Sequence, residues 1–154
     1  MTGTGDAHGC IFCDALGRGG GDPLILFRGS ACFVILNLYP YNNGHMMIVP
    51  IRHVGTLADL AADELAELMR LTQRGEIALQ EAYRPQGMNV GINLGRSAGA
   101  GVVDHVHVHL VPRWTGDTNF MSVVGNVRVL PEDLEQTAGR LKPIFERLDR
   151  SQST

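Results

Sequence analysis

The sequence predicts one α+β domain, because strand-like and helix-like segments follow one another along a chain of single-domain size. The chain has 154 residues, of which 44% are hydrophobic and 19% charged, so it can bury a core. Apolar strand-like segments span residues 24–37, 45–50, 87–95 and 105–112, and amphipathic helix-like segments span 56–83 and 131–150. We expect a flexible leader at 1–9, a single domain at 10–150 and a frayed tail at 151–154.

The first three strands follow from apolar runs that turn residues separate. Residues 24–37 are predicted to form two short strands joined by a turn at Arg28-Gly29-Ser30. The next loop, residues 38–45, contains Pro40 and the turn pair Asn43-Gly44. A third strand follows at 45–50, where a continuous apolar run indicates burial on both faces.

Two helices follow from apolar residues that recur every three or four positions. In the segment 56–83, leucines repeat at this spacing with charges between them, and Asp63 is the expected N-cap. In the segment 131–150, Pro131 suits the first helical position, where its missing N–H costs nothing. Pro143 lies inside the same segment and is expected to kink or break that helix.

Composition and charge exclude several classes of protein. The formal net charge is −3, whereas nucleic-acid-binding surfaces carry a basic excess. No apolar run approaches the ~20 residues that span a bilayer, and the first residues lack the apolar core of a signal peptide. The three cysteines do not suggest a disulfide framework. We therefore expect a cytoplasmic protein with neither nucleic-acid nor membrane partners.

The stretch "DHVHVHLVPRW" places His105, His107 and His109 at alternate positions. On a strand the three imidazoles share one face, which stays available, and the apolar residues between them share the other, which packs on a helix. Positions two apart on a strand are separated by ~6.6 Å, so one metal cannot take all three from a regular strand. A central imidazole that does the chemistry, with flanking imidazoles that orient it, fits better. A neutral imidazole can attack phosphorus and form a covalent intermediate.

The glycine-rich residues 95–101 lead directly into this strand. Glycine lets the backbone approach a phosphate closely and offer its N–H groups, so a small anionic ligand is expected there. The alternative is that the three histidines merely alternate on a half-exposed strand. The combination of three alternating histidines with a glycine-rich loop favours the functional interpretation.

The pair "CIFC", Cys10 and Cys13, has the spacing of half a zinc site. A redox pair is a second interpretation, and packing that anchors the leader is a third. Cys32 lies within a strand pattern and is expected in the core.

The motif "HVHVHLV" resembles the signature of the histidine triad family, and the segments "NLYPYNNGHMMIVPIRH" (37–53) and "INLGRSAGAG" (92–101) are similar to that family's upstream segment and phosphate loop. The resemblance implies a five-stranded antiparallel sheet with two helices. It also implies a homodimer whose sheets join. The substrate would be a nucleoside, with adenine favoured, joined to a phosphate chain or another leaving group.

The resemblance also assigns roles by position. His107 would be the nucleophile, flanked by His105 and His109, with His45 as a fourth histidine near the site. The nucleotide and its phosphates would be held by Asn37, Asn93, Gly99, Ala100, Gly101 and Trp114. Some relatives carry structural zinc, and the matching ligands here would be Cys10, Cys13, His53 and His105. No organic cofactor is expected.

One departure from the family pattern is informative. Most triad hydrolases place a glutamine four residues before the first histidine, where this chain has Gly101. This feature and the downstream "VPRWTGDTNFM" resemble the mycobacterial type of diadenosine tetraphosphate phosphorylase, a branch of the family. The missing side chain leaves room for inorganic phosphate, so phosphorolysis to ADP and ATP is the first hypothesis. Hydrolysis of dinucleoside polyphosphates or nucleoside phosphoramidates is the alternative within enzymes, and a non-catalytic nucleotide-binding regulator is the alternative outside them.

Overall fold

The computed structural model describes residues 9–18, 21–117 and 132–152. Within them the chain forms five strands in one antiparallel sheet, in the order β1-β2-β3-β5-β4. The strands are β1 (Ile25–Arg28), β2 (Cys32–Leu36), β3 (Met46–Pro50), β4 (Gly87–Ile92) and β5 (Val108–Arg113). The expected α+β class and five-stranded antiparallel sheet are therefore confirmed.

Three helices accompany the sheet in the described part of the chain, one more than expected. They are α1 (Ile11–Gly17), α2 (Ala62–Tyr83) and α3 (Leu134–Gln152), with short 3-10 turns η1 (Leu57–Asp59) and η2 (Arg96–Ala98). The additional helix, α1, begins directly after Cys10. It is too short to show an amphipathic period in the sequence, and its position depends on contacts with distant residues.

Both predicted helix starts need correction. The N-cap of α2 is Ala61 rather than Asp63, because the Glu64 carboxylate reaches back to accept a hydrogen bond from the Ala61 N–H at 2.8 Å. That bond satisfies the backbone donor of the N-cap residue itself and is one half of a capping box. Helix α3 begins at Leu134, after Pro131, which itself lies outside the described residues.

Pro143 does not break α3, which runs unbroken through it to Gln152. A proline removes the hydrogen bond to the carbonyl four residues earlier and crowds that carbonyl. Here the carbonyl belongs to Gly139, and both residues are exposed, so water can take the place of the lost donor. Of the predicted kink or break, the break is therefore wrong, because the proline lies on the solvent face.

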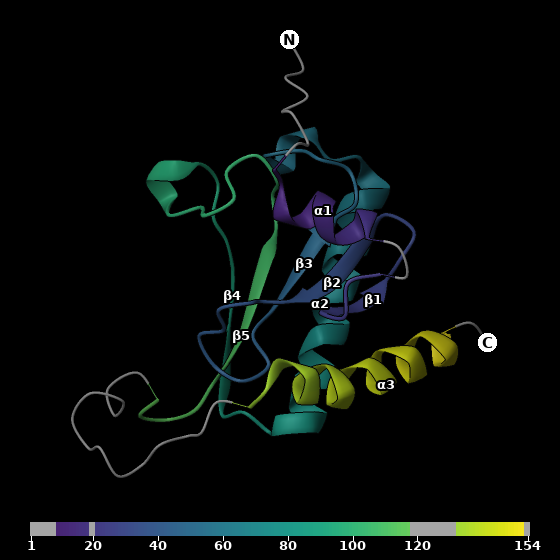
Figure 1. Ribbon diagram of the computed structural model, residues 1–154, viewed down its shortest axis with the longest axis vertical. Coiled ribbons are helices and arrows are strands. Elements are labelled where there is room, and N and C mark those ends of the chain that lie inside the picture. The colour runs from purple at the N-terminus through teal and green to yellow at the C-terminus, as the bar shows by residue number, and fades with distance from the viewer. Residues whose placement is uncertain (1–8, 19–20, 118–131, 153–154) are drawn as a thin grey trace.

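The sheet has an apolar core on each face, and Figure 1 shows α1 in front of the sheet and α2 behind it. The larger core joins alternate residues of β2, β3 and β5 to α2 and α3, including Val108 and Leu110. The smaller core joins Phe33, Ile35 and other residues of the opposite face to Phe12 of α1. Since side chains alternate along a strand, His107 and His109 point to the face that α1 covers.

Candidate active site

The three histidines keep their alternation, although the strand begins later than predicted. The pairing of β5 with its neighbours starts at Val108, so His105 and His107 precede the ladder. The Val106 N–H instead bonds to the Val54 carbonyl at 2.7 Å, which extends the backbone without a neighbouring strand. The valines between the histidines are buried in the larger core, so the imidazoles lie on the opposite face.

The imidazole face is less open than the sequence suggested. His105 is completely buried and His107 is 4% exposed, because Phe12 of α1 packs against both rings, with centroids 5.3 Å and 4.9 Å away. Only His109 is partly exposed. The expectation of an available face is wrong for His105, because the helix that the sequence did not reveal covers it, whereas His107 still lines a cavity.

Hydrogen bonds to backbone groups determine which nitrogen of each imidazole carries the proton. His107 Nδ1 lies 2.9 Å from the His105 carbonyl, which only accepts, so Nδ1 is protonated and Nε2 is bare. The Tyr41 N–H, which only donates, lies 3.1 Å from His45 Nδ1, so a neutral His45 carries its proton on Nε2.

His109 completes a directed chain between these two rings. The protonated Nε2 of His45 donates to His109 Nδ1 at 3.0 Å. The proton of His109 is therefore on Nε2, which points at the bare Nε2 of His107 at 3.1 Å. The three linked imidazoles therefore place a lone pair, on His107 Nε2, beside a proton donor, on His109 Nε2.

Burial keeps all of these imidazoles neutral. Desolvation lowers the pKa of His45 from 6.5 to about 4, with the neighbouring His109 and His107 adding to the effect. Desolvation also lowers the pKa of His107, against a hydrogen bond to the His105 carbonyl that raises it, and lowers the pKa of His109. A neutral imidazole is the form that can act as a nucleophile near neutral pH.

A cavity of about 1070 Å³ lies beside this chain of histidines. Its lining includes His45, His107 and His109 together with four of the residues expected to hold the nucleotide, Asn37, Asn93, Gly99 and Gly101. Ala100 is 7% exposed and is not among the lining residues. Trp114 lies outside the lining that the described residues define, and its backbone N–H donates to Asp117.

Glycines open the cavity at two points. Gly91 of β4 is paired with His109, and a Cβ there would meet nothing within 4 Å. A Cβ at Gly101 would likewise meet nothing within 4 Å, so the position where the family commonly carries glutamine is open space.

The predicted zinc ligands come together in one group. The Sγ atoms of Cys10 and Cys13 and the Nδ1 atoms of His53 and His105 belong to one group whose ligand atoms lie within 4.8 Å of one another. Cys10 Sγ is 3.3 Å from His105 Nδ1, and the two Nδ1 atoms are 3.2 Å apart. This group could hold a metal ion, and the two sulfur and two nitrogen donors fit tetrahedral zinc.

The tautomer of His105 also fits a metal ligand. Its Nε2 lies 2.7 Å from the Pro50 carbonyl, so Nε2 carries the proton and Nδ1 presents its lone pair to the group. In the absence of a cation, burial and the neighbouring Cys10 raise the pKa of the Cys13 thiol to about 11. Cys32 lies elsewhere, completely buried in the larger core as expected.

Sequence reasoning missed the polar cluster at the end of β5, although it named Trp114 there. Arg113 forms an ion pair with Asp117 at 2.8 Å and places its guanidinium 5.7 Å from the centre of the Tyr41 ring. Asp117 also accepts a hydrogen bond from Asn42, which is far away in the sequence. The four-residue spacing of Arg113 and Asp117 is the only sequence signal for this cluster. That spacing alone does not indicate that two charged residues form an ion pair.

This fold and this arrangement of histidines define a domain of the histidine triad type, and the chain belongs to the HIT domain family, whose model matches residues 22–116. It is 49% identical over 114 residues to the AP-4-A phosphorylase of Mycobacterium tuberculosis. That match covers 74% of this chain and 58% of the relative, so the chain spans less than two thirds of the relative's length.

Two further relatives extend the comparison. A bis(5'-adenosyl)-triphosphatase of Dictyostelium discoideum is 30% identical over 128 residues, covering 79% of this chain and 85% of the relative. The crystal structure of a Zn-bound histidine triad family protein from Mycobacterium smegmatis matches with a TM-score of 0.74 and 26% identity, over 95% of this chain and 99% of that one. Among the described residues, no helix is both long and apolar enough to cross a membrane.

Proposed function

We propose that the chain cleaves dinucleoside polyphosphates, with diadenosine tetraphosphate favoured, through a nucleotidyl intermediate on His107. The observation that carries the proposal is the tautomer of His107, a residue that lines the cavity: the His105 carbonyl holds the proton on Nδ1 and leaves Nε2 bare. The 49% identity to an AP-4-A phosphorylase supports the substrate class.

In the first step, His107 Nε2 attacks the α-phosphorus of the substrate. A phosphorus–nitrogen bond forms, the bond from that phosphorus to the bridging oxygen breaks, and ATP leaves. His109 carries its proton on Nε2, beside the attacking nitrogen, and is the donor placed to stabilise the leaving oxygen. His45 holds His109 in that tautomer by donating to its Nδ1.

In the second step, an oxygen of inorganic phosphate attacks the adenylyl phosphorus and the phosphorus–nitrogen bond breaks. ADP is released together with one proton at neutral pH, and His107 regains its lone pair. The open space at Gly101 supports this step, since no side chain occupies the position beside the phosphate loop. Water in the same position would release AMP instead.

The cavity supports a long nucleotide ligand. Its volume of about 1070 Å³ exceeds the ~300–1,000 Å³ that is typical of sites for small ligands. Asn37 is assigned to the ribose, and the segment from Asn93 to Gly101 is assigned to the phosphates. Trp114 is kept as a candidate for stacking on adenine, although it lies outside the lining.

The deciding experiment is product analysis of diadenosine tetraphosphate cleavage with and without inorganic phosphate, resolving AMP, ADP and ATP by chromatography. ADP and ATP formed only with phosphate are expected. AMP and ATP formed regardless of phosphate would make the chain a hydrolase. If diadenosine tetraphosphate is not cleaved and nucleoside phosphoramidates are, phosphoramidates replace it as the proposed substrate.

His107→Ala is expected to abolish catalysis and keep nucleotide binding. An unchanged rate in this variant would contradict the covalent mechanism.

We also propose that Cys10, Cys13, His53 and His105 hold a structural zinc ion, which would tie α1 to the segments around β3 and β5. Zinc would leave the chemistry to His107 and would fix the helix whose Phe12 covers that ring. Metal analysis is expected to find one equivalent of zinc, lost in Cys13→Ser and kept in the control Cys32→Ala. A chelator that leaves the melting temperature unchanged would contradict the proposal.

A homodimer and a cytoplasmic setting stay predictions. Strand β4 is an edge of the sheet, and Val90 and Leu94 on or next to it are 54% and 45% exposed. An exposed edge strand supports the joining of two sheets in a dimer. Light scattering after size exclusion measures the mass in solution, and a monomer would contradict the expectation.

A further inference from the structure

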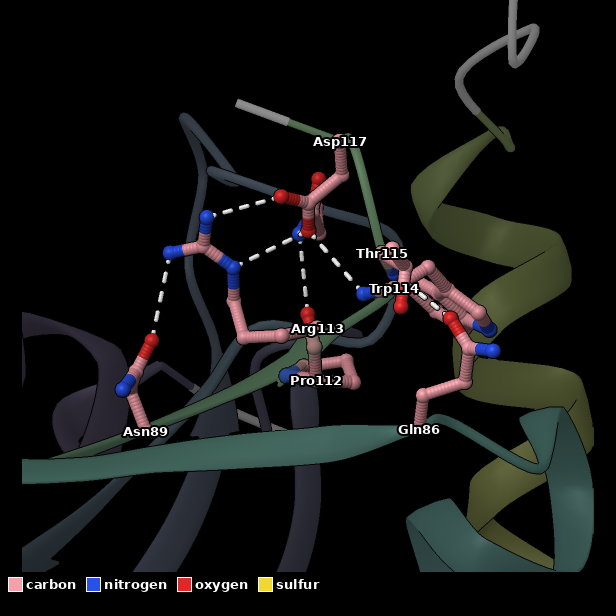
Figure 2. A network of polar contacts seen from close by, with 8 residues as sticks. Gln86, Asn89, Pro112, Arg113, Trp114, Thr115 and Asp117 are labelled. Carbon is pink, nitrogen blue, oxygen red and sulfur yellow. Dashed lines mark hydrogen bonds and ion pairs between the residues drawn. The ribbon is translucent and has the colours of Figure 1, made fainter. Parts of the chain in front are cut away.

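The carboxylate of Asp117 accepts hydrogen bonds from three residues in two parts of the chain. Figure 2 shows it above Arg113, whose Nε donates to Oδ2 at 2.9 Å and whose Nη2 donates to Oδ1 at 2.8 Å. The backbone N–H of Trp114 and the side-chain amide of Asn42 also donate to Oδ2, at 3.1 Å and 2.7 Å. The Arg113 guanidinium holds the pKa of the Asp117 carboxyl well below its usual range, so the acceptor is ionised.

Asn42 connects this carboxylate to the loop that precedes β3. Its amide nitrogen uses both hydrogens, one on Asp117 and one on the Pro112 carbonyl at 2.8 Å. Its own backbone carbonyl accepts a hydrogen bond from the His45 N–H at 3.1 Å. The adjacent Tyr41 N–H donates to His45 Nδ1. The loop that Asp117 anchors therefore contacts both the backbone and the ring of His45.

The contact with the ring has a chemical consequence. The Tyr41 N–H makes His45 carry its proton on Nε2, from which it donates to His109. If the N–H moved away, His45 could carry its proton on Nδ1 and present a bare Nε2. His109 could then carry its proton on Nδ1 and donate it to His45. The Nε2 of His109 would be bare and would face the lone pair on the Nε2 of His107.

We infer that Asp117 is a positioning residue for nucleotidyl transfer: through Asn42 it holds the Tyr41 N–H against His45 and so fixes the tautomers of His45 and His109. This inference rests on the proposed function, because it concerns the same site. Asp117 acts through the loop and does not need to touch the substrate.

The same segment offers a matched control. The Thr115 N–H donates to Gln86 Oε1 at 2.6 Å, which ties the chain after β5 to the start of β4 without involving the loop (Figure 2). Gln86 is exposed. If Asp117 only stabilised this segment, loss of the Gln86 contact would have the same kind of effect.

The experiment reads the tautomers directly, by long-range proton–nitrogen NMR of protein labelled with ¹⁵N-histidine, without substrate. In the unaltered protein His45 and His109 are each expected as the single Nε2–H form. Asn42→Ala and Asp117→Ala are expected to give mixed tautomers at both rings, and Gln86→Ala is expected to change neither. Asp117→Asn keeps one oxygen for Asn42 and is expected to lie between.

Turnover supplies the second readout. Asn42→Ala and Asp117→Ala are each expected to lower kcat by tenfold to about a hundredfold, the cost of misplacing a reacting group. The double variant is expected to be no slower than the slower single variant, because the two residues act in one path. Gln86→Ala is expected to keep its rate.

The tautomers decide the inference separately from the activity. Single Nε2–H forms retained in both Asn42→Ala and Asp117→Ala would overturn it, even if the rate fell. If Asp117→Ala does not fold, Asn42→Ala decides alone, since it leaves the Arg113–Asp117 pair in place. An unaltered protein that cleaves no dinucleotide would overturn the proposed function, while the NMR result would still decide how Asp117 acts on His45.

Discussion

Two glycines inside helices differ in what a side chain would meet, which predicts different effects of replacement by alanine on the free energy of unfolding. A Cβ at Gly75 of α2 would lie 2.8 Å from Leu110 Cδ2 and 3.0 Å from Met46 Sδ, and both of those side chains are completely buried. A Cβ at Gly139 of α3 would meet nothing within 4 Å. Gly75 therefore lets α2 lie close against β3 and β5.

The expected magnitudes follow from two opposing effects. Alanine is favoured over glycine in a helix interior by about 1 kcal/mol, which applies at both positions. At Gly75 overpacking opposes this with about 1–3 kcal/mol, because the contacted side-chain ends have no solvent into which to move. Gly139→Ala should therefore raise the free energy of unfolding, and Gly75→Ala should leave it unchanged or lower it. The two variants should differ by about 1–3 kcal/mol.

Urea unfolding followed by circular dichroism measures both variants on one scale. A difference of about 1 kcal/mol corresponds to about 2–4 °C in melting temperature for a domain of this size. Because Leu110 follows His109 on β5, Gly75→Ala should also slow turnover, whereas Gly139→Ala should not. Equal stabilisation by the two replacements would refute the reasoning, since it would show that α2 moves away from the sheet at no cost.

Further predictions concern acid sensitivity and two turns. The pKa of His45 is 6.5 in the unfolded chain but about 4 in the folded chain. The free energy of unfolding should therefore fall as the pH drops from 6.5 to about 4, because the unfolded chain binds the proton first. Urea titrations should show a smaller fall for His45→Gln. Glu67 accepts hydrogen bonds from the backbone N–H groups of residues 30–32, and Glu67→Ala should cost about 2 kcal/mol in thermal unfolding, with Glu67→Gln less damaging. Gly44 has a φ of 87°, and a Cβ there would lie 2.7 Å from Leu79 Cδ2, so Gly44→Ala should lower both the melting temperature and the turnover; an unaffected variant would show that the turn tolerates a side chain.

Local pattern was sufficient for most of the sheet. The strands around Cys32–Leu36 and Met46–Pro50 were predicted from apolar runs, because a strand buried on both faces needs little more than such a run. The break predicted at Pro143 was wrong because the prediction considered the lost hydrogen bond and not the exposure of the proline, which lets water replace that bond. The error at Asp63 arose because Glu64 satisfied the free backbone donor from inside the helix.

The candidate site was also predicted in part from the sequence. Alternation along a strand is a local property, so the sequence by itself determined that His105, His107 and His109 share one face, and the motifs around them determined the family. It also named the four possible metal ligands, which the structure brings within 4.8 Å of one another.

Only the tertiary structure decided which nitrogen of each imidazole is bare. The groups that decide it are the carbonyls of His105 and Pro50 and the N–H of Tyr41. Every residue carries such backbone groups, so their identity leaves no trace in the sequence, and their positions depend on the packing of distant segments. The link from Asp117 to Asn42 is of the same kind, because it joins residues 75 positions apart and exists only when the end of β5 meets the loop before β3.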